Sequence, residues 1–171
     1  ITGNSGVTTF STSGAFFSGV GCGFQEAVAN AGWTSTGKAW SSSSFTTVGY
    51  NSMNVTFKHV SYANPGIGNG PTSFKFQYKV GAGTWTDIGG AYSIATTTGC
   101  SFTTVSKTLP AACNNQSSVF IRTVSQNTGT SGVGNRVANL LITGTAAGCT
   151  APTTPALSGA SNVCPGTSTL L

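Results

Sequence analysis

The stretch Ser73-Phe74-Lys75-Phe76-Gln77-Tyr78-Lys79-Val80 decides the fold. Its aromatic and aliphatic residues alternate strictly with polar and charged ones. A period of two is the side-chain period of an extended strand, so one face of this segment is buried and the other is wet. The stretch therefore predicts a strand at the surface of a sheet that covers a core.

Further strands are predicted on both sides of this one. In 52–60, Met53, Val55 and Phe57 point to one face, whereas 119–124 is apolar or β-branched on both faces, as in a central strand. Two more strands are predicted at 14–18 and 136–143.

Turn residues separate these runs. Clusters of Gly, Asn and Pro occupy 64–71, 81–83, 89–90 and 127–132, and they supply the backbone angles that tight turns require. Only 25–30 has the composition for one helical turn. The pattern predicts an all-β fold, an antiparallel β-sandwich of the jelly-roll type.

The apolar alternation stops near Cys149, where Pro152 and Pro155 follow within a few positions. We expect a β-sandwich domain over 1–148, a Pro/Thr linker over 149–157, and an incomplete first strand of a following module over 158–171. The last segment is too short to bury a core by itself.

The charge inventory excludes most enzyme classes. Charged residues make up 5% of the chain, against about 25% in an average domain. Glu26 and Asp87 are the only carboxylates and His59 is the only imidazole. A glycosidase would need both carboxylates at one site, and His59 lacks a motif of the triad type, so a hydrogen-bonded or exposed strand histidine is the simpler interpretation. We expect no enzyme activity, no cofactor and no metal site.

The net charge of +5 comes from missing acids, because the seven Lys and Arg residues are scattered singly. Nucleic-acid binding requires clustered cations, so we do not expect it. No run approaches the roughly 18 apolar residues of a membrane span, and we expect no membrane insertion.

The five cysteines contain no CxxC pair and indicate disulfides in an oxidising compartment. The spacing of Cys100 and Cys113 favours a local disulfide, and Cys22 and Cys149 are candidates to join the two ends of the domain. Cys164 is left over, which suggests that its partner lies in a following module.

Several segments resemble the β-sandwich modules of large secreted and cell-surface adhesin-like proteins of the Bacteroidota, which are exported by type IX secretion. The resemblance covers most of 40–144 and rests on these segments: WSSSSF at 40–45, the strand at 55–60, FQYKVGAGTWTDIG at 76–89, VFIR at 119–122 and NRVANLLITG at 135–144.

The tail VCPGTSTL at 163–170 is similar to the start of the Ig-like repeats that follow in such proteins. The resemblance implies an extracellular, cell-surface location and a modular context, and it carries over no active-site residue. The family often has an Asp near Ala138, and its absence here puts a metal or polar site at that strand in doubt.

The candidate ligand-binding residues are aromatic, because exposed rings can stack on sugar faces. We place Trp33, Trp40, Trp85 and Tyr92 near loops or strand ends. Core packing is the alternative for each of them.

Three functions compete. The first is a non-catalytic structural or adhesive module that contacts neighbouring modules or other surface proteins. The second is a carbohydrate-binding module of a secreted protein, with glycans as partners. The third is a hydrolase dependent on His59, which the scarcity of ionisable groups disfavours.

Overall fold

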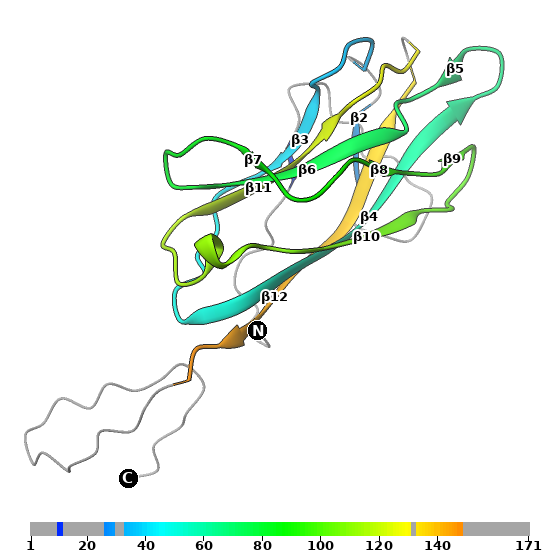
Figure 1. Ribbon diagram of the computed structural model, residues 1–171. Coiled ribbons are helices and arrows are strands. Elements are labelled where there is room, and N and C mark those ends of the chain that lie inside the picture. Colours follow the sequence, from blue (N-terminus) through cyan, green and yellow to red (C-terminus); the bar gives the residue numbers. More distant parts are fainter. Residues whose placement is uncertain (1–9, 12–25, 30–32, 131–132, 149–171) are drawn as a thin grey trace, which may run out of the picture.

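The structure is a computed structural model that describes residues 10–11, 26–29, 33–130 and 133–148 (Figure 1). The regular elements in these ranges are strands and one short 3-10 helix, η1 (Ala111–Cys113). The strands are β1 (Phe10–Ser11), β2 (Glu26–Ala29), β3 (Ala39–Ser42), β4 (Tyr50–Asn64), β5 (Gly68–Asn69), β6 (Ser73–Val80), β7 (Thr86–Asp87), β8 (Tyr92–Ser93), β9 (Thr96–Thr97), β10 (Thr103–Thr108), β11 (Val119–Ser125) and β12 (Asn135–Ala146).

The strands form two sheets. The first sheet has the order β1-β3-β11-β6-β7, with β8 also paired to β6. The second sheet has the order β10-β4-β12-β2, with β5 and β9 also paired to β4. Within the described ranges, only the two-residue pairing of β4 with β9 is parallel. β4 and β12 are the longest strands and extend together beyond the others at one end of the molecule (Figure 1).

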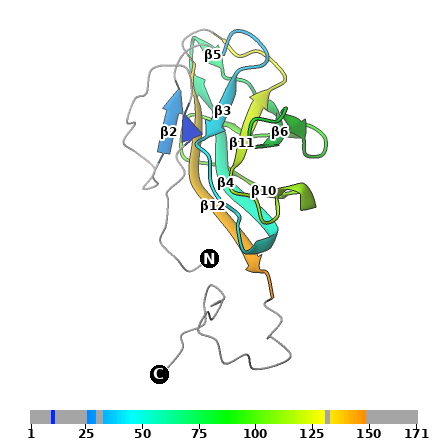
Figure 2. The same cartoon turned by 90° about the vertical axis from the view of Figure 1, so that its left-hand side faces the viewer.

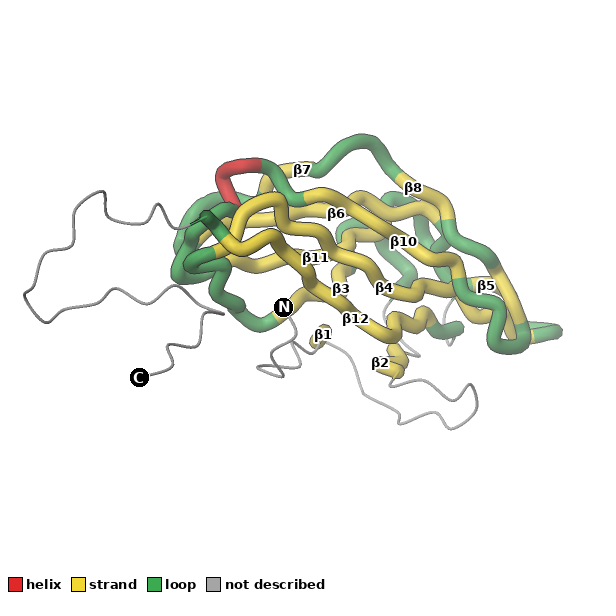
Figure 3. Tube along the Cα trace, turned by 90° about the horizontal axis from the view of Figure 1, so that it is seen from below, coloured by secondary structure: helices red, strands yellow, loops and turns green. Residues whose placement is uncertain are grey.

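The longer strands alternate between the two sheets along the chain. β3, β6 and β11 belong to the first sheet, whereas β4, β10 and β12 belong to the second. Each connection between them therefore crosses the sandwich. Figure 2 shows β3 and β11 on one side of the long β4 and β12, and Figure 3 shows β7 and β8 along one border of the molecule with β1 and β2 along the opposite border. The predicted all-β, jelly-roll-like antiparallel sandwich is confirmed.

The strongest sequence patterns gave the correct strands. β6 has the predicted bounds, the predicted strand at 52–60 lies inside β4, and the one at 136–143 lies inside β12. β11 lies between β3 and β6, as its two apolar faces indicated.

The predicted helical turn at 25–30 is wrong, because Glu26–Ala29 is strand β2 and pairs with β12. Four residues cannot hold a helix by themselves, and an open sheet edge offers their backbone ready hydrogen-bond partners. The predicted strand at 14–18, the linker at 149–157 and the segment at 158–171 lie outside the described residues.

The core lies between the inward faces of β4, β6 and β11. Phe57 of the second sheet stacks on Phe76 of the first, with ring centroids 5.8 Å apart. The fully buried large side chains around this pair are Trp40, Met53, Val55, Phe74 and Ile121. This two-sided packing holds the backbone of the first sheet, so that the side chains on its opposite face have fixed positions.

Candidate functional site

The outer face of the first sheet carries a compact group of polar, charged and aromatic side chains. Because side chains alternate along a strand, the residues of β6 that lie between its core residues face outward. They are Lys75, Gln77 and Lys79. On β11, Phe120 and Arg122 pair with Lys79 and Gln77 in the register of the two strands, so they share this outer face.

A chain of hydrogen bonds crosses these strands. Asp87 of β7 accepts a bond of 2.7 Å from Lys75 Nζ at Oδ2 and one of 2.6 Å from Gln77 Nε2 at Oδ1. Gln77 Oε1 in turn accepts a bond of 2.7 Å from Arg122 Nε. The bond from Lys75 is the main reason why the pKa of Asp87 lies below its ordinary value. The amide of Gln77 therefore holds the carboxylate and the guanidinium on either side of it.

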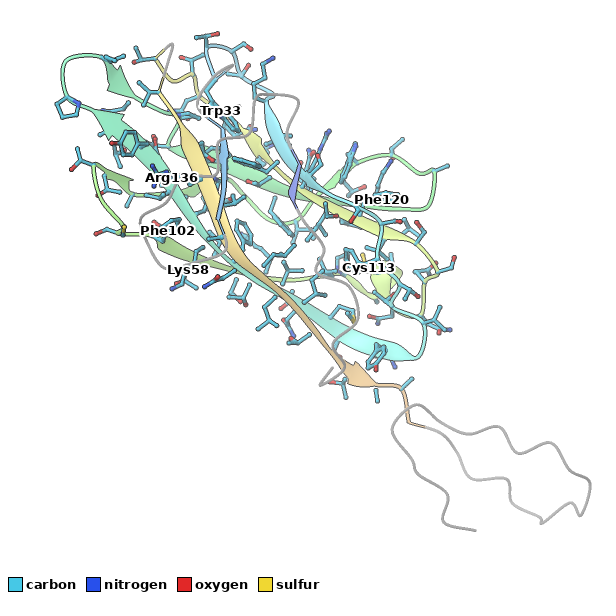
Figure 4. The ribbon with its side chains drawn as sticks, turned by 180° about the vertical axis from the view of Figure 1, so that it is seen from behind. Trp33, Lys58, Phe102, Cys113, Phe120 and Arg136 are labelled. Carbon is cyan, nitrogen blue, oxygen red and sulfur yellow. The ribbon has the colours of Figure 1, made fainter. Side chains whose placement is uncertain are left out.

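Two aromatic rings lie beside this chain. The guanidinium carbon of Arg122 is 4.2 Å from the centroid of the Trp85 ring, and Lys79 Nζ is 5.2 Å from Trp85 and 4.5 Å from Phe120. Both rings are half-buried. We call this group the Trp85 face; its members are Lys75, Gln77, Lys79, Trp85, Asp87, Phe120 and Arg122. Figure 4 shows Phe120 well separated from Lys58 and Arg136, which belong to the second sheet.

The other two tryptophans proposed as ligand-binding residues are core residues. Trp33 is 2% exposed and Trp40 is 0% exposed, and their rings pack against each other with centroids 6.1 Å apart. The indole N–H of Trp40 donates to Asn135 Oδ1 over 2.7 Å. A fully enclosed ring has no face for a sugar, so the prediction that Trp33 and Trp40 bind a ligand is wrong.

His59 is fully buried and forms hydrogen bonds at both ring nitrogens. Nε2 lies 2.7 Å from Asn135 Oδ1 and Nδ1 lies 3.0 Å from Tyr92 Oη. An indole N–H can only donate, so the bond from Trp40 fixes Oδ1 as the acceptor. His59 Nε2 must then carry the proton and donate to the same oxygen.

The remaining bonds of this network follow from that tautomer. His59 Nδ1 has a lone pair, so the Tyr92 hydroxyl donates to it, and the Thr123 hydroxyl donates to Tyr92 Oη. Burial lowers the pKa of His59 to about 3 and raises that of Tyr92 above its ordinary value. His59 is neutral, enclosed and without access to substrate, as expected of a hydrogen-bonded strand histidine.

Tyr92 is partly buried, and both its hydroxyl and its ring are engaged by other residues of the protein. Its hydroxyl is bonded to His59 and Thr123, and its ring stacks on Phe74 at a centroid distance of 6.1 Å. Lys107 Nζ lies 5.4 Å from the ring. Of the four predicted residues, Trp85 alone lies on the outer face of a sheet, beside the hydrogen-bonded chain of Asp87, Gln77 and Arg122.

The predicted disulfide between Cys100 and Cys113 is wrong. Cys113 is a free, fully buried thiol, whereas Cys100 is disulfide-bonded. Cys100 precedes β10 and Cys113 follows it. The strand between them, β10, is paired with β4 along its whole length. Cys22, Cys149 and Cys164 lie outside the described residues.

The outer face of the second sheet offers a comparison. There Lys58 Nζ donates to Thr104 Oγ1 over 2.7 Å, and the guanidinium carbon of Arg136 lies 4.9 Å from the Tyr62 ring.

Within the described ranges, no three His, Cys, Asp or Glu side chains gather as a metal site requires, and no helix is long and apolar enough to cross a membrane.

Sequence reasoning missed Phe120, Arg122, Gln77 and Lys79 as members of the surface around Trp85. Phe120 and Arg122 lie about forty positions from β6, and only the pairing of the strands brings them together. The available signal was the outward set of β6, whose three residues are all long polar side chains. Trp85 itself packs on the outer face of the first sheet beside Arg122 and Lys79.

No family model and no curated protein matches the chain. Solved structures similar to it include a CBM4, a carbohydrate-binding module, at 15% identity with a TM-score of 0.48, over 84% of this chain and 83% of the other. Another is the CBM35 of Abf62 from Cellvibrio japonicus, at 15% identity with a TM-score of 0.43, over 84% and 96%. A third is the N-terminal cellulose-binding domain of β-1,4-glucanase C from Cellulomonas fimi, at 8% identity with a TM-score of 0.48, over 82% and 89%.

Proposed function

We propose that the domain is a non-catalytic carbohydrate-binding module and that the Trp85 face binds the glycan. The observation that supports this is the position of Trp85, a half-buried ring on the outer face of the first sheet with hydrogen-bonding groups on its neighbouring strands. An aromatic ring takes the apolar face of a sugar, and amide, carboxylate and cationic groups bind its hydroxyls. Gln77, Asp87 and Arg122 supply these groups.

The geometry of the Trp85 face favours binding over catalysis. Asp87 accepts bonds at both carboxylate oxygens, and its lowered pKa keeps it ionised and unable to act as an acid near neutral pH. His59, the other candidate for proton transfer, is enclosed on the far side of the first sheet. The side chains of the face are already held in place by one another, which lowers the entropic cost of binding.

We further propose an extracellular location. Disulfides persist in oxidising compartments, and Cys100 is disulfide-bonded. The resemblance to surface modules of the Bacteroidota leads to the same compartment. A glycan-binding domain there can act in adhesion, so the predicted adhesive role would follow from sugar binding.

Affinity electrophoresis against a panel of soluble plant and bacterial polysaccharides, followed by calorimetry, tests the proposal. Trp85→Ala should weaken binding at least about tenfold, because a buried aromatic contact typically dominates such an interface. Tyr62→Ala is the matched control, since Tyr62 also lies against an arginine but on the second sheet. Binding that survives Trp85→Ala and is lost in Tyr62→Ala would place the site on the second sheet and contradict the proposed Trp85 site.

A further inference from the structure

The charges on the Trp85 face are not balanced. Lys75, Lys79 and Arg122 face one carboxylate, Asp87. Each oxygen of that carboxylate accepts one hydrogen bond, Oδ2 from Lys75 and Oδ1 from Gln77. The pair of Lys75 with Asp87, at 2.7 Å, is the only ion pair among the described side chains. Lys79 and Arg122 therefore form no ion pair in the described part of the chain, although the charge of Asp87 acts on Arg122 from across Gln77.

Arg122 is held in a position suited to an anion. Its Nε donates to Gln77 Oε1, and its guanidinium lies against the Trp85 ring. These two contacts fix the plane of the guanidinium and engage its inner edge. The edge formed by Nη1 and Nη2 stays available, and it matches a carboxylate or sulfate with two parallel hydrogen bonds.

Lys79 places a second positive charge beside the indole ring of Trp85. Its ammonium lies within cation–π distance of both Trp85 and Phe120. The rings hold the charge at the surface of the sheet and leave its hydrogen-bond donors without a carboxylate among the described residues. A ligand stacked at Trp85 would thus meet two cations beside one ring.

We infer that the glycan bound by the Trp85 face is acidic, with a carboxylate or sulfate group paired to Arg122 and a second contact to Lys79. This inference rests on the proposed function. It defines the ligand class by charge complementarity: a sugar polymer with repeated anionic groups would meet two cations that form no ion pair in the described part of the chain.

Matched polymers test the inference. The uronate arm compares polygalacturonate with its fully methyl-esterified form, and the sulfate arm compares dextran sulfate with dextran. At least one acidic polymer should bind about tenfold tighter than its neutral counterpart, and 0.5 M NaCl should weaken that binding. The arm that responds identifies the acidic group.

Charge variants locate the contact. Arg122→Gln and Lys79→Gln should each weaken binding to the acidic polymer at least about fivefold, and thermal melts show whether each variant is folded. Lys58→Gln removes the same charge from the second sheet and should change affinity less than twofold. Lys79 has no hydrogen bond to a protein group in the described structure, so its variant tests the inference even where Arg122→Gln disturbs the fold.

The outcomes separate the two proposals. Equal binding of acidic and neutral polymers, lost in Trp85→Ala, would overturn the inference and leave the proposed function intact. Binding to no polysaccharide would overturn both. Single-stranded DNA bound as tightly as the acidic polymer, or an equal loss in Lys58→Gln, would show unspecific attraction of polyanions and would also overturn the inference.

Discussion

His59 on β4 donates a hydrogen bond of 2.7 Å to Asn135 on β12, and the same oxygen of Asn135 accepts the indole N–H of Trp40. One amide oxygen thus joins both sheets of the sandwich at a point where all three side chains are fully buried. Because Asn135 Oδ1 must accept from two donors, the imidazole is held in one neutral tautomer. The stability of the fold should depend on that neutrality.

The first prediction concerns acid. Burial holds the pKa of His59 at about 3, whereas an unfolded histidine titrates near 6.5. The unfolded chain therefore binds a proton below pH 6.5 that the folded chain does not. Stability is unaffected above that pH and falls as pH decreases from about 6.5 toward 3, by up to about 1.4 kcal/mol per pH unit.

The scarcity of ionisable groups makes this test clean. His59 is the only histidine in the chain, and the pKa of Asp87 lies below its ordinary value, so Asp87 does not titrate between pH 5 and 6.5. Urea unfolding at a series of pH values between 5 and 6.5 should show the loss in the native protein and a flat profile in His59→Gln. An imidazole NMR signal that titrates near pH 6 in the folded state would contradict the buried, neutral histidine.

The second prediction concerns Asn135. Asn135→Ala leaves the N–H groups of Trp40 and His59 buried without an acceptor, and each such group costs about 1–3 kcal/mol. We expect the free energy of unfolding to fall by about 2–4 kcal/mol. Asn54→Ala is the control, because Asn54 also bonds across strands, to Thr108, but in an exposed position. A loss in Asn135→Ala no larger than in Asn54→Ala would show that the network contributes little.

The strands could be predicted from the sequence where burial follows the strand period. β6 has one buried and one outer face, so its pattern stands out locally, and β11 is apolar enough to indicate its central place. β2 could not be predicted in this way, because four residues of mixed character take their structure from the edge of β12. The structure of such a segment is determined by its pairing with a distant strand, and a local sequence pattern does not contain that information.

The aromatic residues show the same limit. Trp33, Trp40 and Trp85 have similar surroundings in the sequence, rich in Gly, Ser and Thr. Trp40 is a core residue because Asn135, 95 positions away, accepts its N–H. Trp85 lies on the outer face of the first sheet, where Arg122 and Lys79 contact its ring. Both outcomes depend on partners from other strands. The sequence alone could therefore identify the three tryptophans as candidates, but it could not distinguish the core residues from the surface residue.

The third prediction concerns a glycine in the long strand β12. A Cβ built at Gly144 would overlap Met53 Sδ and approach Met53 Cε to 3.1 Å. Met53 is fully buried, so it has little room to move. Gly144→Ala should lower the free energy of unfolding by about 1–3 kcal/mol, as expected of an overpacked core.

Gly148→Ala is the matched control for this change, because a Cβ at Gly148 meets nothing within 4 Å. Its effect should stay within about 0.5 kcal/mol. Chemical unfolding of the two variants side by side measures the difference. If the double variant Met53→Ala with Gly144→Ala is no better tolerated than the sum of the single changes, overlap with Met53 is not the cause.

The last prediction concerns Cys113. Its thiol is fully buried in the core, and burial raises its pKa to about 11. The backbone around it is also fixed, because its N–H donates to Pro110 O over 2.9 Å and its carbonyl accepts the Thr47 hydroxyl over 2.5 Å. A thiol that is both protonated and enclosed cannot attack a reagent until the structure opens.

We therefore expect iodoacetamide at pH 8 to alkylate Cys113 at least about a thousandfold more slowly in the native protein than in urea. Peptide mass spectrometry after timed labelling follows this residue separately from the other four cysteines. The same digest, run without reductant, should contain the Cys113 peptide as a free thiol and the Cys100 peptide in a crosslink. A crosslink between Cys100 and Cys113 would contradict the free, buried thiol of Cys113.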